Sequence, residues 1–186
     1  MKYLIIGLGN IGPEYVDTRH NIGFMVADAF AKQSHAPFFN MRLAYYTEFK
    51  YKSRSIYVIK PTTYMNLSGK AVNYWMQELG IPKENILVLV DDLALPFGTV
   101  RLKPKGSPAG HNGLKNIEAM LGTAEYPRLR FGIGDDFPKG RQVDYVLSGF
   151  DPEEQKELPA LIDRSIEFIE SFVTAGTELT MTRLNK

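Results

Sequence analysis

The pattern of apolar and polar positions alternates along the chain between the period of a strand and that of a helix. Continuous apolar runs over residues 3–6 and 86–90 predict strands that are buried on both faces of a sheet. Alternating apolar and polar residues over 44–52 and 55–60 predict a hairpin. With two shorter runs the pattern predicts six strands, the last two over residues 99–103 and 129–133.

Apolar residues at helical spacing lie between these strands and after the last of them. Gly80 and Pro82 stop the second predicted helix. Asp151 followed by Pro152 starts the final one, as a cap and a proline at the first helical position, and Pro159 is expected to kink it. Residues 36–41 are expected to be irregular, and the predicted helices cover residues 21–34, 69–79, 114–121 and 151–174.

This order of elements predicts an α/β fold in one domain over residues 1–186. Its central sheet is expected to be largely parallel, with helices on both faces, and the hairpin makes the sheet mixed. In such a fold the ligand site lies outside the carboxyl ends of the parallel strands. Side chains in the loops after the strands are therefore the first candidates for chemistry.

Composition narrows the class of protein. The chain has 186 residues, 44% hydrophobic and 23% charged, as in ordinary soluble globular proteins. It has no cysteine, which excludes disulfides, thiolate metal sites and a cysteine nucleophile. No signal peptide precedes the first strand, and no apolar run approaches the roughly 18 residues of a membrane span. A cytoplasmic protein without membrane contact is expected.

Charge is separated along the chain although the net charge is only +1. Between residues 93 and 117 there are four basic residues and no acid, whereas acids gather in the C-terminal third. This basic part has the charge to contact a phosphate backbone. Solvated surface lysines are the alternative. The four basic residues are Arg101, Lys103, Lys105 and Lys115.

A glycine triplet opens the loop after the first strand. Gly7, Gly9 and Gly12 satisfy the G-x-G-x-x-G pattern of dinucleotide-binding proteins. That pattern requires a helix opening directly after the strand and an acid at the end of a second strand. Here Pro13 follows the triplet, and the acid at a suitable distance, Asp28, lies inside a helical pattern. The glycines indicate a tight loop that brings backbone close to a substrate.

Four loops carry polar side chains that are expected to meet at one edge of the sheet. His20 with Asp91 suggests a general base oriented by a carboxylate. The sequence has no G-x-S-x-G elbow, so an activated water is the simpler nucleophile, with asparagines to bind substrate and oxyanion. A structural histidine and turn-forming asparagines remain the alternative. The loops hold Asn10 and His20, Met65 and Asn66, Asp91, and His111 and Asn112.

A metal site is not expected. His20, His111 and Asp91 are possible ligands, but no helical H-x-x-x-H or H-E-x-x-H spacing supports such a site. Neither a metal nor any other cofactor is therefore predicted.

Four blocks resemble, in order and spacing, the signature blocks of the bacterial peptidyl-tRNA hydrolase family: GLGNIGPEYVDTRHNIGF, KPTTYMNLSGKAV, VDDLALPFGTVRLK and GHNGLKNIEAML. The resemblance covers nearly the whole chain. It implies a monomeric three-layer α/β/α sandwich around a mixed, twisted sheet. It also implies a metal-free esterase that cleaves the bond between a peptide and the 3′-terminal ribose of tRNA, with the acceptor stem, the CCA end and the nascent peptide as partners.

The resemblance also implies a role for individual residues. The catalytic base falls on His20 and its acid on Asp91, and Asn10 joins them at the ester. Substrate binding falls on Tyr15, Met65, Asn66 and Asn112, and tRNA binding on Lys103 and Arg130.

The sequence departs from the family pattern in two places. An N-P-G after the first strand is replaced by Asn10-Ile11-Gly12, with the proline displaced to Pro13, and a common acid is replaced by Ala94. Neither departure removes a residue assigned to catalysis. A different hydrolase on a similar scaffold, such as a metal-dependent aminopeptidase, and an RNA-binding relative without activity are the alternatives.

Overall fold

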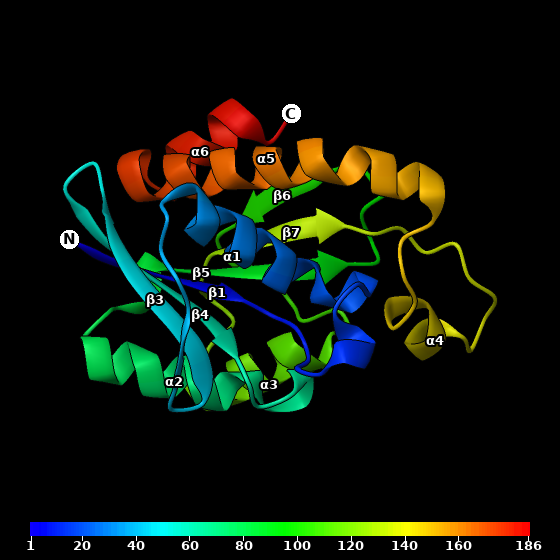
Figure 1. Ribbon diagram of the computed structural model, residues 1–186, viewed down its shortest axis with the longest axis horizontal. Coiled ribbons are helices and arrows are strands. Elements are labelled where there is room, and N and C mark those ends of the chain that lie inside the picture. The colour runs from blue at the N-terminus through cyan, green and yellow to red at the C-terminus, as the bar shows by residue number, and fades with distance from the viewer.

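Seven strands form one twisted, mixed sheet in a computed structural model that describes residues 1–186 (Figure 1). The strand order is β2-β3-β4-β1-β5-β7-β6. The four central strands β4, β1, β5 and β7 are parallel, and both flanks of the sheet are antiparallel. The strands are β1 (Lys2–Gly7), β2 (Phe39–Met41), β3 (Ala44–Tyr51), β4 (Arg54–Pro61), β5 (Ile86–Asp92), β6 (Val100–Lys103) and β7 (Arg128–Gly132).

Helices cover both faces of this sheet, which confirms the predicted single-domain, three-layer architecture. Figure 1 shows α1, α5 and α6 on one face and α2 and α3 on the other, with α4 standing apart beyond the strand ends. The helices are α1 (Ile22–Gln33), α2 (Ser68–Leu79), α3 (Asn112–Leu121), α4 (Gln142–Val146), α5 (Pro152–Ala175) and α6 (Thr177–Leu184). None of them is both long and apolar enough to cross a membrane.

The continuous apolar runs of β1 and β5 are explained by two separate cores. Ile5 of β1 packs into the core shared with α1 and α5. Its neighbours Leu4 and Ile6 pack into the second core, with α2 and α3. Because successive side chains of a strand point to opposite faces, a strand between two helical layers must be apolar at every position.

Three elements differ from the prediction. Residues 36–41, expected to be irregular, contain the edge strand β2. All three residues of β2 are exposed, so no buried face marks it in the sequence. The helices α4 and α6 were also not predicted. The predicted final helix is present as α5, with Pro159 inside it. The capping box of Asp151 and Glu154 at the start of α5 does follow the sequence signal.

Two glycines bring α1 unusually close to the sheet. A Cβ atom on Gly23 would lie 2.5 Å from the Leu8 nitrogen and 2.5 Å from the Leu89 oxygen, so only glycine fits there. A Cβ on Gly7 would lie 2.4 Å from the Gly23 oxygen. This contact places the short 3₁₀ turn before α1, Arg19–Asn21, beside the carboxyl end of β5.

Candidate active site

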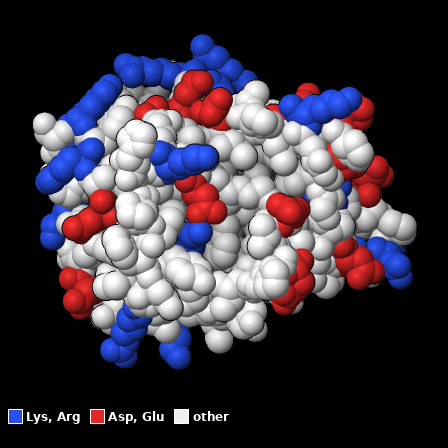
Figure 2. All heavy atoms as spheres, in the orientation of Figure 1, with Lys and Arg blue, Asp and Glu red and all other residues white.

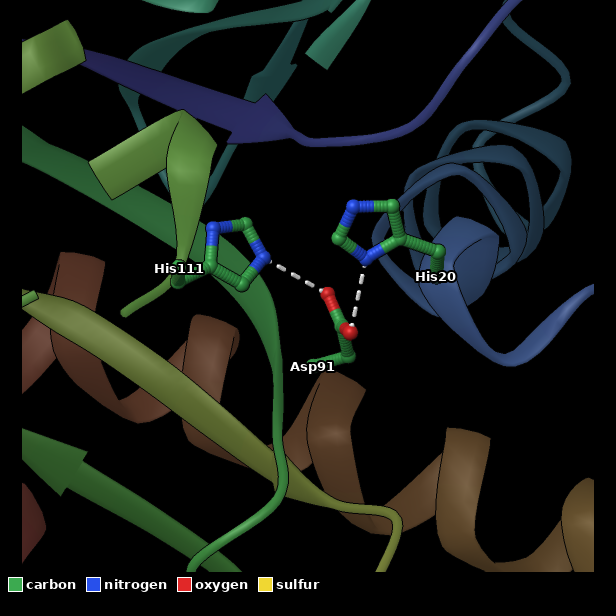
Figure 3. Close-up of side chains that lie close together, drawn as sticks. All are labelled: His20, Asp91 and His111. Carbon is green, nitrogen blue, oxygen red and sulfur yellow. Dashed lines mark hydrogen bonds and ion pairs between the residues drawn. The ribbon is translucent and has the colours of Figure 1, made fainter. Parts of the chain in front are cut away.

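Asp91 lies between two histidines at the carboxyl end of β5 (Figure 3). Its Oδ2 atom is 2.8 Å from Nδ1 of His20, and its Oδ1 atom is 2.8 Å from Nε2 of His111. The two imidazole rings are 5.0 Å apart between centroids. Each carboxylate oxygen of Asp91 therefore has one imidazole partner, and the aspartate holds both rings in place.

Each of the three side chains is positioned by a different element. Asp91 is the sixth residue of β5 and its side chain is 2% exposed. His20 sits in the turn Arg19–Asn21 before α1, and His111 is the N-cap residue of α3. Loops that are far apart in the sequence thus meet at one sheet edge, where an α/β fold places its ligand site.

The protonation of His111 follows from its contacts. Its Nδ1 atom accepts hydrogen bonds from the backbone nitrogens of Gly113 and Leu114, at 3.1 and 3.3 Å. An acceptor nitrogen carries no proton, so the ring proton is on Nε2 and is donated to Asp91. The first turn of α3 therefore fixes His111 as a neutral Nε2–H tautomer.

His20 has the opposite arrangement. Because Asp91 accepts through Oδ2, Nδ1 of His20 carries the proton, and Nε2 is left with a free lone pair. No group of the protein bonds to Nε2, and His20 lines the cavity described below. Burial lowers the pKa of His20, but the charge of Asp91 and the hydrogen bond to it outweigh burial and raise the pKa above 6.5. His20 is thus an oriented base of increased strength.

Asp91 stays ionised although it is buried. Burial acts to raise the pKa of Asp91, but attraction to His111 and His20 and the hydrogen bonds from both rings hold the pKa well below its usual range. A permanent negative charge at this position stabilises the imidazolium that forms when His20 accepts a proton.

A second cluster organises the loop after β1. The side chain of Asn21 accepts from the backbone nitrogen of Asn10 and donates to its backbone oxygen, both at 2.8 Å. Oδ1 of Asn10 in turn accepts from the backbone nitrogen of Met65 at 2.7 Å. Tyr64 adopts a left-handed φ of 62°, which turns the chain so that the Met65 nitrogen faces Asn10. The side-chain nitrogen Nδ2 of Asn10 makes no hydrogen bond within the protein and remains available as a donor.

Replacing Asn21 by alanine is expected to lower the free energy of unfolding by about 1–3 kcal/mol, because a backbone donor and a backbone acceptor lose their partner. Asn21 is 2% exposed, so water does not replace the bonds without rearrangement. Urea unfolding measures the loss. The matched control is Asn40→Ala on the exposed strand β2, which is expected to change stability little. Equal effects of the two substitutions would contradict the role given to Asn21.

A cavity of about 470 Å³ opens beside the histidines. One end is formed by His20, Asp91 and His111, and its walls come from the loop over 106–112 and from α4. Of the residues that the sequence singled out, this cavity contains His20, Asp91, Asn112, Lys103 and Arg130.

Four other candidates do not line this cavity: Asn10, Tyr15, Met65 and Asn66. Asn10 meets Met65, which is buried at 4% exposure. Asn66 and Asn112 are exposed and make no side-chain hydrogen bond within the protein. Tyr15 is partly buried in a short 3₁₀ turn. Asn10 is thus held by hydrogen bonds to its neighbours, whereas the side-chain amides of Asn66 and Asn112 are free.

The two candidate tRNA contacts differ from each other. Lys103 is exposed at the end of the edge strand β6. Arg130 is hydrogen-bonded through Nε to Asp92, with 16% of its side chain exposed. On the face shown in Figure 2, basic side chains gather along the upper-left edge, whereas acidic and basic side chains are interspersed over the middle and right.

The sequence did not indicate the role of two residues of the site. His111 was expected at this sheet edge and as a possible metal ligand, but not as a partner of Asp91, and Asn21 was not singled out. The signal for His111 was its position directly before a helix, where a side-chain acceptor is needed as a cap. Nothing in the sequence marks Asn21, because its partner is the backbone of a distant loop.

His20, Asp91 and His111 are also the one group of side chains with metal-ligand chemistry, their ligand atoms lying within 4.8 Å of one another. Both imidazole N–H groups that face Asp91 are engaged in hydrogen bonds to it, and Nδ1 of His111 is engaged by α3. A cation between these groups would have to displace two imidazole protons. The arrangement therefore fits proton transfer better than metal binding.

A buried carboxylate, an oriented imidazole and an adjoining cavity on an α/β sheet are features of a hydrolase. The family described as peptidyl-tRNA hydrolase matches residues 4–186. The peptidyl-tRNA hydrolases of Porphyromonas gingivalis and Bacteroides fragilis are 57% and 56% identical to the chain, with both proteins covered completely. The chain belongs to the peptidyl-tRNA hydrolase family.

Solved structures agree with this assignment. A crystal structure of peptidyl-tRNA hydrolase from Acinetobacter baumannii superimposes with a TM-score of 0.93 at 32% sequence identity. The match covers 98% of this chain and 94% of that one. The family expected from the signature blocks is thereby confirmed, together with the fold.

Proposed function

We propose that this protein hydrolyses the ester between a peptide and the 3′-terminal ribose of tRNA, so that tRNA is recycled from peptidyl-tRNA released by stalled ribosomes. The observation that carries the mechanism is the bond of His20 to Asp91, which leaves Nε2 of His20 as a free base at the cavity.

In the proposed reaction Nε2 of His20 takes a proton from a water molecule as the water oxygen attacks the ester carbonyl. The negative charge of Asp91 stabilises the imidazolium, and asparagine amides stabilise the oxyanion. Collapse of the tetrahedral intermediate breaks the bond to the 3′ oxygen, which takes the proton back from His20. The products are the peptide with a free carboxyl group and tRNA with a 3′-hydroxyl.

Asparagines suit a substrate whose peptide sequence varies. The free amide of Asn66 can pair with the backbone of any peptide, and Asn10 and Asn112 are assigned to the ester and the attacking water. Tyr15 and Met65 are assigned to the crevice beside the 3′ end of the tRNA. A charged amino terminus cannot replace a peptide group in these hydrogen bonds, and an unpaired polar group costs about 1–3 kcal/mol. This accounts for cleavage of peptidyl-tRNA while aminoacyl-tRNA is spared.

The experiment that tests this proposal is release of N-acetylamino acid from N-acetylaminoacyl-tRNA, measured with EDTA present. We expect turnover, and little with the unblocked aminoacyl-tRNA. Turnover that needs an added divalent cation would indicate a metal-dependent hydrolase instead. Binding of tRNA without any turnover would favour an RNA-binding relative. We further propose that the protein acts in the cytoplasm. We also propose that it acts as a monomer, and sedimentation of the active protein tests this oligomeric state.

The pH dependence of kcat/KM is expected to show an acid limb with a pKa above 6.5, the ordinary value for histidine, because His20 must be unprotonated to act as a base. Stability should change in the opposite sense. A raised pKa means that the folded state binds the proton more tightly, so this contribution to stability is complete below pH 6.5 and is lost as pH rises through the folded pKa.

Kinetics from about pH 5.5 to about pH 9 and urea unfolding over the same interval check both trends. Substitution His20→Asn should remove the component of the stability change that comes from His20. If the pKa of the acid limb lies below that of free imidazole, the effect assigned to Asp91 is contradicted.

Replacing Lys103 by alanine is expected to raise KM for peptidyl-tRNA with little change in kcat. Phosphate contacts add affinity without regard to sequence, and each contact contributes about one unit to the slope of log affinity against log salt concentration. Titrations at several salt concentrations should give a slope smaller by about one in the variant. Lys32→Ala, at an exposed position near the end of α1, is the control. An unchanged salt slope for Lys103→Ala would remove it from the tRNA contact.

A further inference from the structure

Arg19 is a buried arginine directly before the proposed base His20, and neither the mechanism nor the expected tRNA contacts use it. It is 7% exposed. Arg19 lies in the turn Arg19–Asn21. There it contacts the part of the chain that connects β7 to α5 and contains α4. A buried guanidinium needs several partners to offset its desolvation, so its contacts indicate what it holds.

The backbone at Arg19 is joined to the end of the α4 segment, defined here as residues 142–149. The Arg19 nitrogen donates to the Ser148 oxygen at 2.9 Å, and Thr18 forms an antiparallel bridge with Gly149. The turn carrying His20 and the α4 segment are therefore paired like two short strands.

The guanidinium adds side-chain contacts to this pairing, including one with the Phe150 ring, whose centroid lies 5.6 Å from its central carbon. Nη1 donates to Oγ of Ser148, and Nη2 forms an ion pair of 2.8 Å with Glu154 at the start of α5. Its central carbon lies 4.2 Å from the centroid of the Tyr145 ring, a stacking distance for a cation on an aromatic face. One side chain thus contacts both the α4 segment and α5.

The α4 segment has other attachments besides Arg19, and they lead to the core and not to the turn of His20. Figure 1 shows α4 beyond the strand ends, apart from the three helical and sheet layers. Gln142 and Val143 are exposed and, with Val146, they form part of the cavity wall. The hydroxyl of Tyr145 donates to the Ile133 oxygen at 2.6 Å. The Tyr145 ring also lies 4.9 Å from the Phe137 ring between centroids, and Tyr145 and Val146 pack against the core shared with α1 and α5. The contacts of Arg19 are the ones that join the segment to the turn of His20.

We propose that Arg19 is a positioning residue that fastens the α4 segment to the turn of His20, and so keeps one wall of the substrate cavity in place. The inference rests on the proposed function for what the cavity binds. Arg19 acts through the wall and not through the base, since Asp91 holds His20 independently. Loss of the fastening therefore weakens substrate binding and leaves the proton transfer intact.

The test is Arg19→Lys, which keeps the charge for Glu154 but loses the planar fork and the stacking on Tyr145. Hydrogen exchange of the Tyr145, Leu147 and Ser148 amides is expected to accelerate about tenfold, while amides over 168–173 in α5 stay unchanged. KM for N-acetylaminoacyl-tRNA should rise about five- to tenfold, with kcat and the acid limb of the pH profile retained. Arg183→Lys, exposed on α6, is the control.

Two further variants keep the proposal testable if Arg19→Lys folds poorly. Ser148→Ala removes the acceptor of Nη1, together with the bond from Oγ of Ser148 to the Tyr145 oxygen, and should give a milder form of the same pattern. Glu154→Gln retains an oxygen that accepts from Nη2 and caps the helix. Its KM is therefore expected to stay close to that of the wild type.

Equal acceleration of exchange in α5 and the α4 segment, or an unchanged KM, would overturn the proposal and leave Arg19 a purely structural residue. The exchange measurement needs no turnover. A wild-type protein without activity would therefore refute the proposed function while the fastening is still tested.

Discussion

Replacing His20 by asparagine is expected to lower kcat for peptidyl-tRNA by about 10²–10⁴-fold, the usual contribution of a general base. Asparagine is the informative substitution because its amide nitrogen can occupy the place of Nδ1 and still donate to Asp91. It provides no equivalent of Nε2, the atom that takes the proton from water. The buried carboxylate keeps a partner, so the fold is preserved while the base is removed.

Single-turnover hydrolysis of N-acetylaminoacyl-tRNA measures the loss, and affinity for tRNA is measured separately. His35→Asn is the matched control, since His35 is exposed at the other end of α1 and has a φ of 54° that asparagine tolerates. We expect the control to match the wild type and His20→Asn to retain tRNA affinity. Full activity in His20→Asn would mean that another group is the base.

The general architecture was predictable from the sequence because it follows from periodicity. The runs at β1 and β5 are apolar at every position since both faces are covered, and this alone indicates central strands. The edge strand β2 gives no such signal, because its three residues face solvent. The helix α4 has five residues, none of them buried, so it shows no apolar face either.

The candidate site was predictable only in part. His20 and Asp91 follow from their loops, since carboxyl ends of parallel strands meet at one edge. His111 was expected at the same edge, but its bond to Asp91 depends on distances within that edge, which spacing along the chain does not give. Arg19 was equally hidden, because its partners Ser148 and Glu154 are 129 and 135 residues away.

The arrangement around Asp91 separates two histidines that are chemically identical. His111 receives backbone N–H groups on Nδ1 and becomes a fixed donor, whereas Nε2 of His20 faces the cavity without a partner. The N-terminal turn of α3 thus directs the His111 proton to Oδ1 of Asp91. Oδ2 accepts from Nδ1 of His20 and so selects the tautomer of that ring. The basicity of His20 follows from Asp91, whereas α3 fixes the second partner of the same carboxylate.

Replacing Asp91 by asparagine should consequently be as damaging as removing the base, with a loss in kcat of about 10²–10⁴-fold. An amide has one acceptor and one donor where the carboxylate has two acceptors. His111 is held as a donor by α3, so the amide oxygen must face His111 and the amide nitrogen must face His20. Nδ1 of His20 then becomes an acceptor, its proton moves to Nε2, and the base is lost.

This explanation makes a prediction about a double variant that simple loss of charge does not make. His111→Ala alone should lower activity, because it leaves Oδ1 of the buried carboxylate without a partner. In the Asp91→Asn background the same substitution frees the amide to turn its oxygen toward His20, so activity should partly return. Nitrogen-15 NMR of the imidazoles should show His20 as the Nε2–H tautomer in Asp91→Asn and as the Nδ1–H tautomer in the double variant. If activity in the double variant falls below that of Asp91→Asn, the negative charge and not the tautomer is what Asp91 supplies.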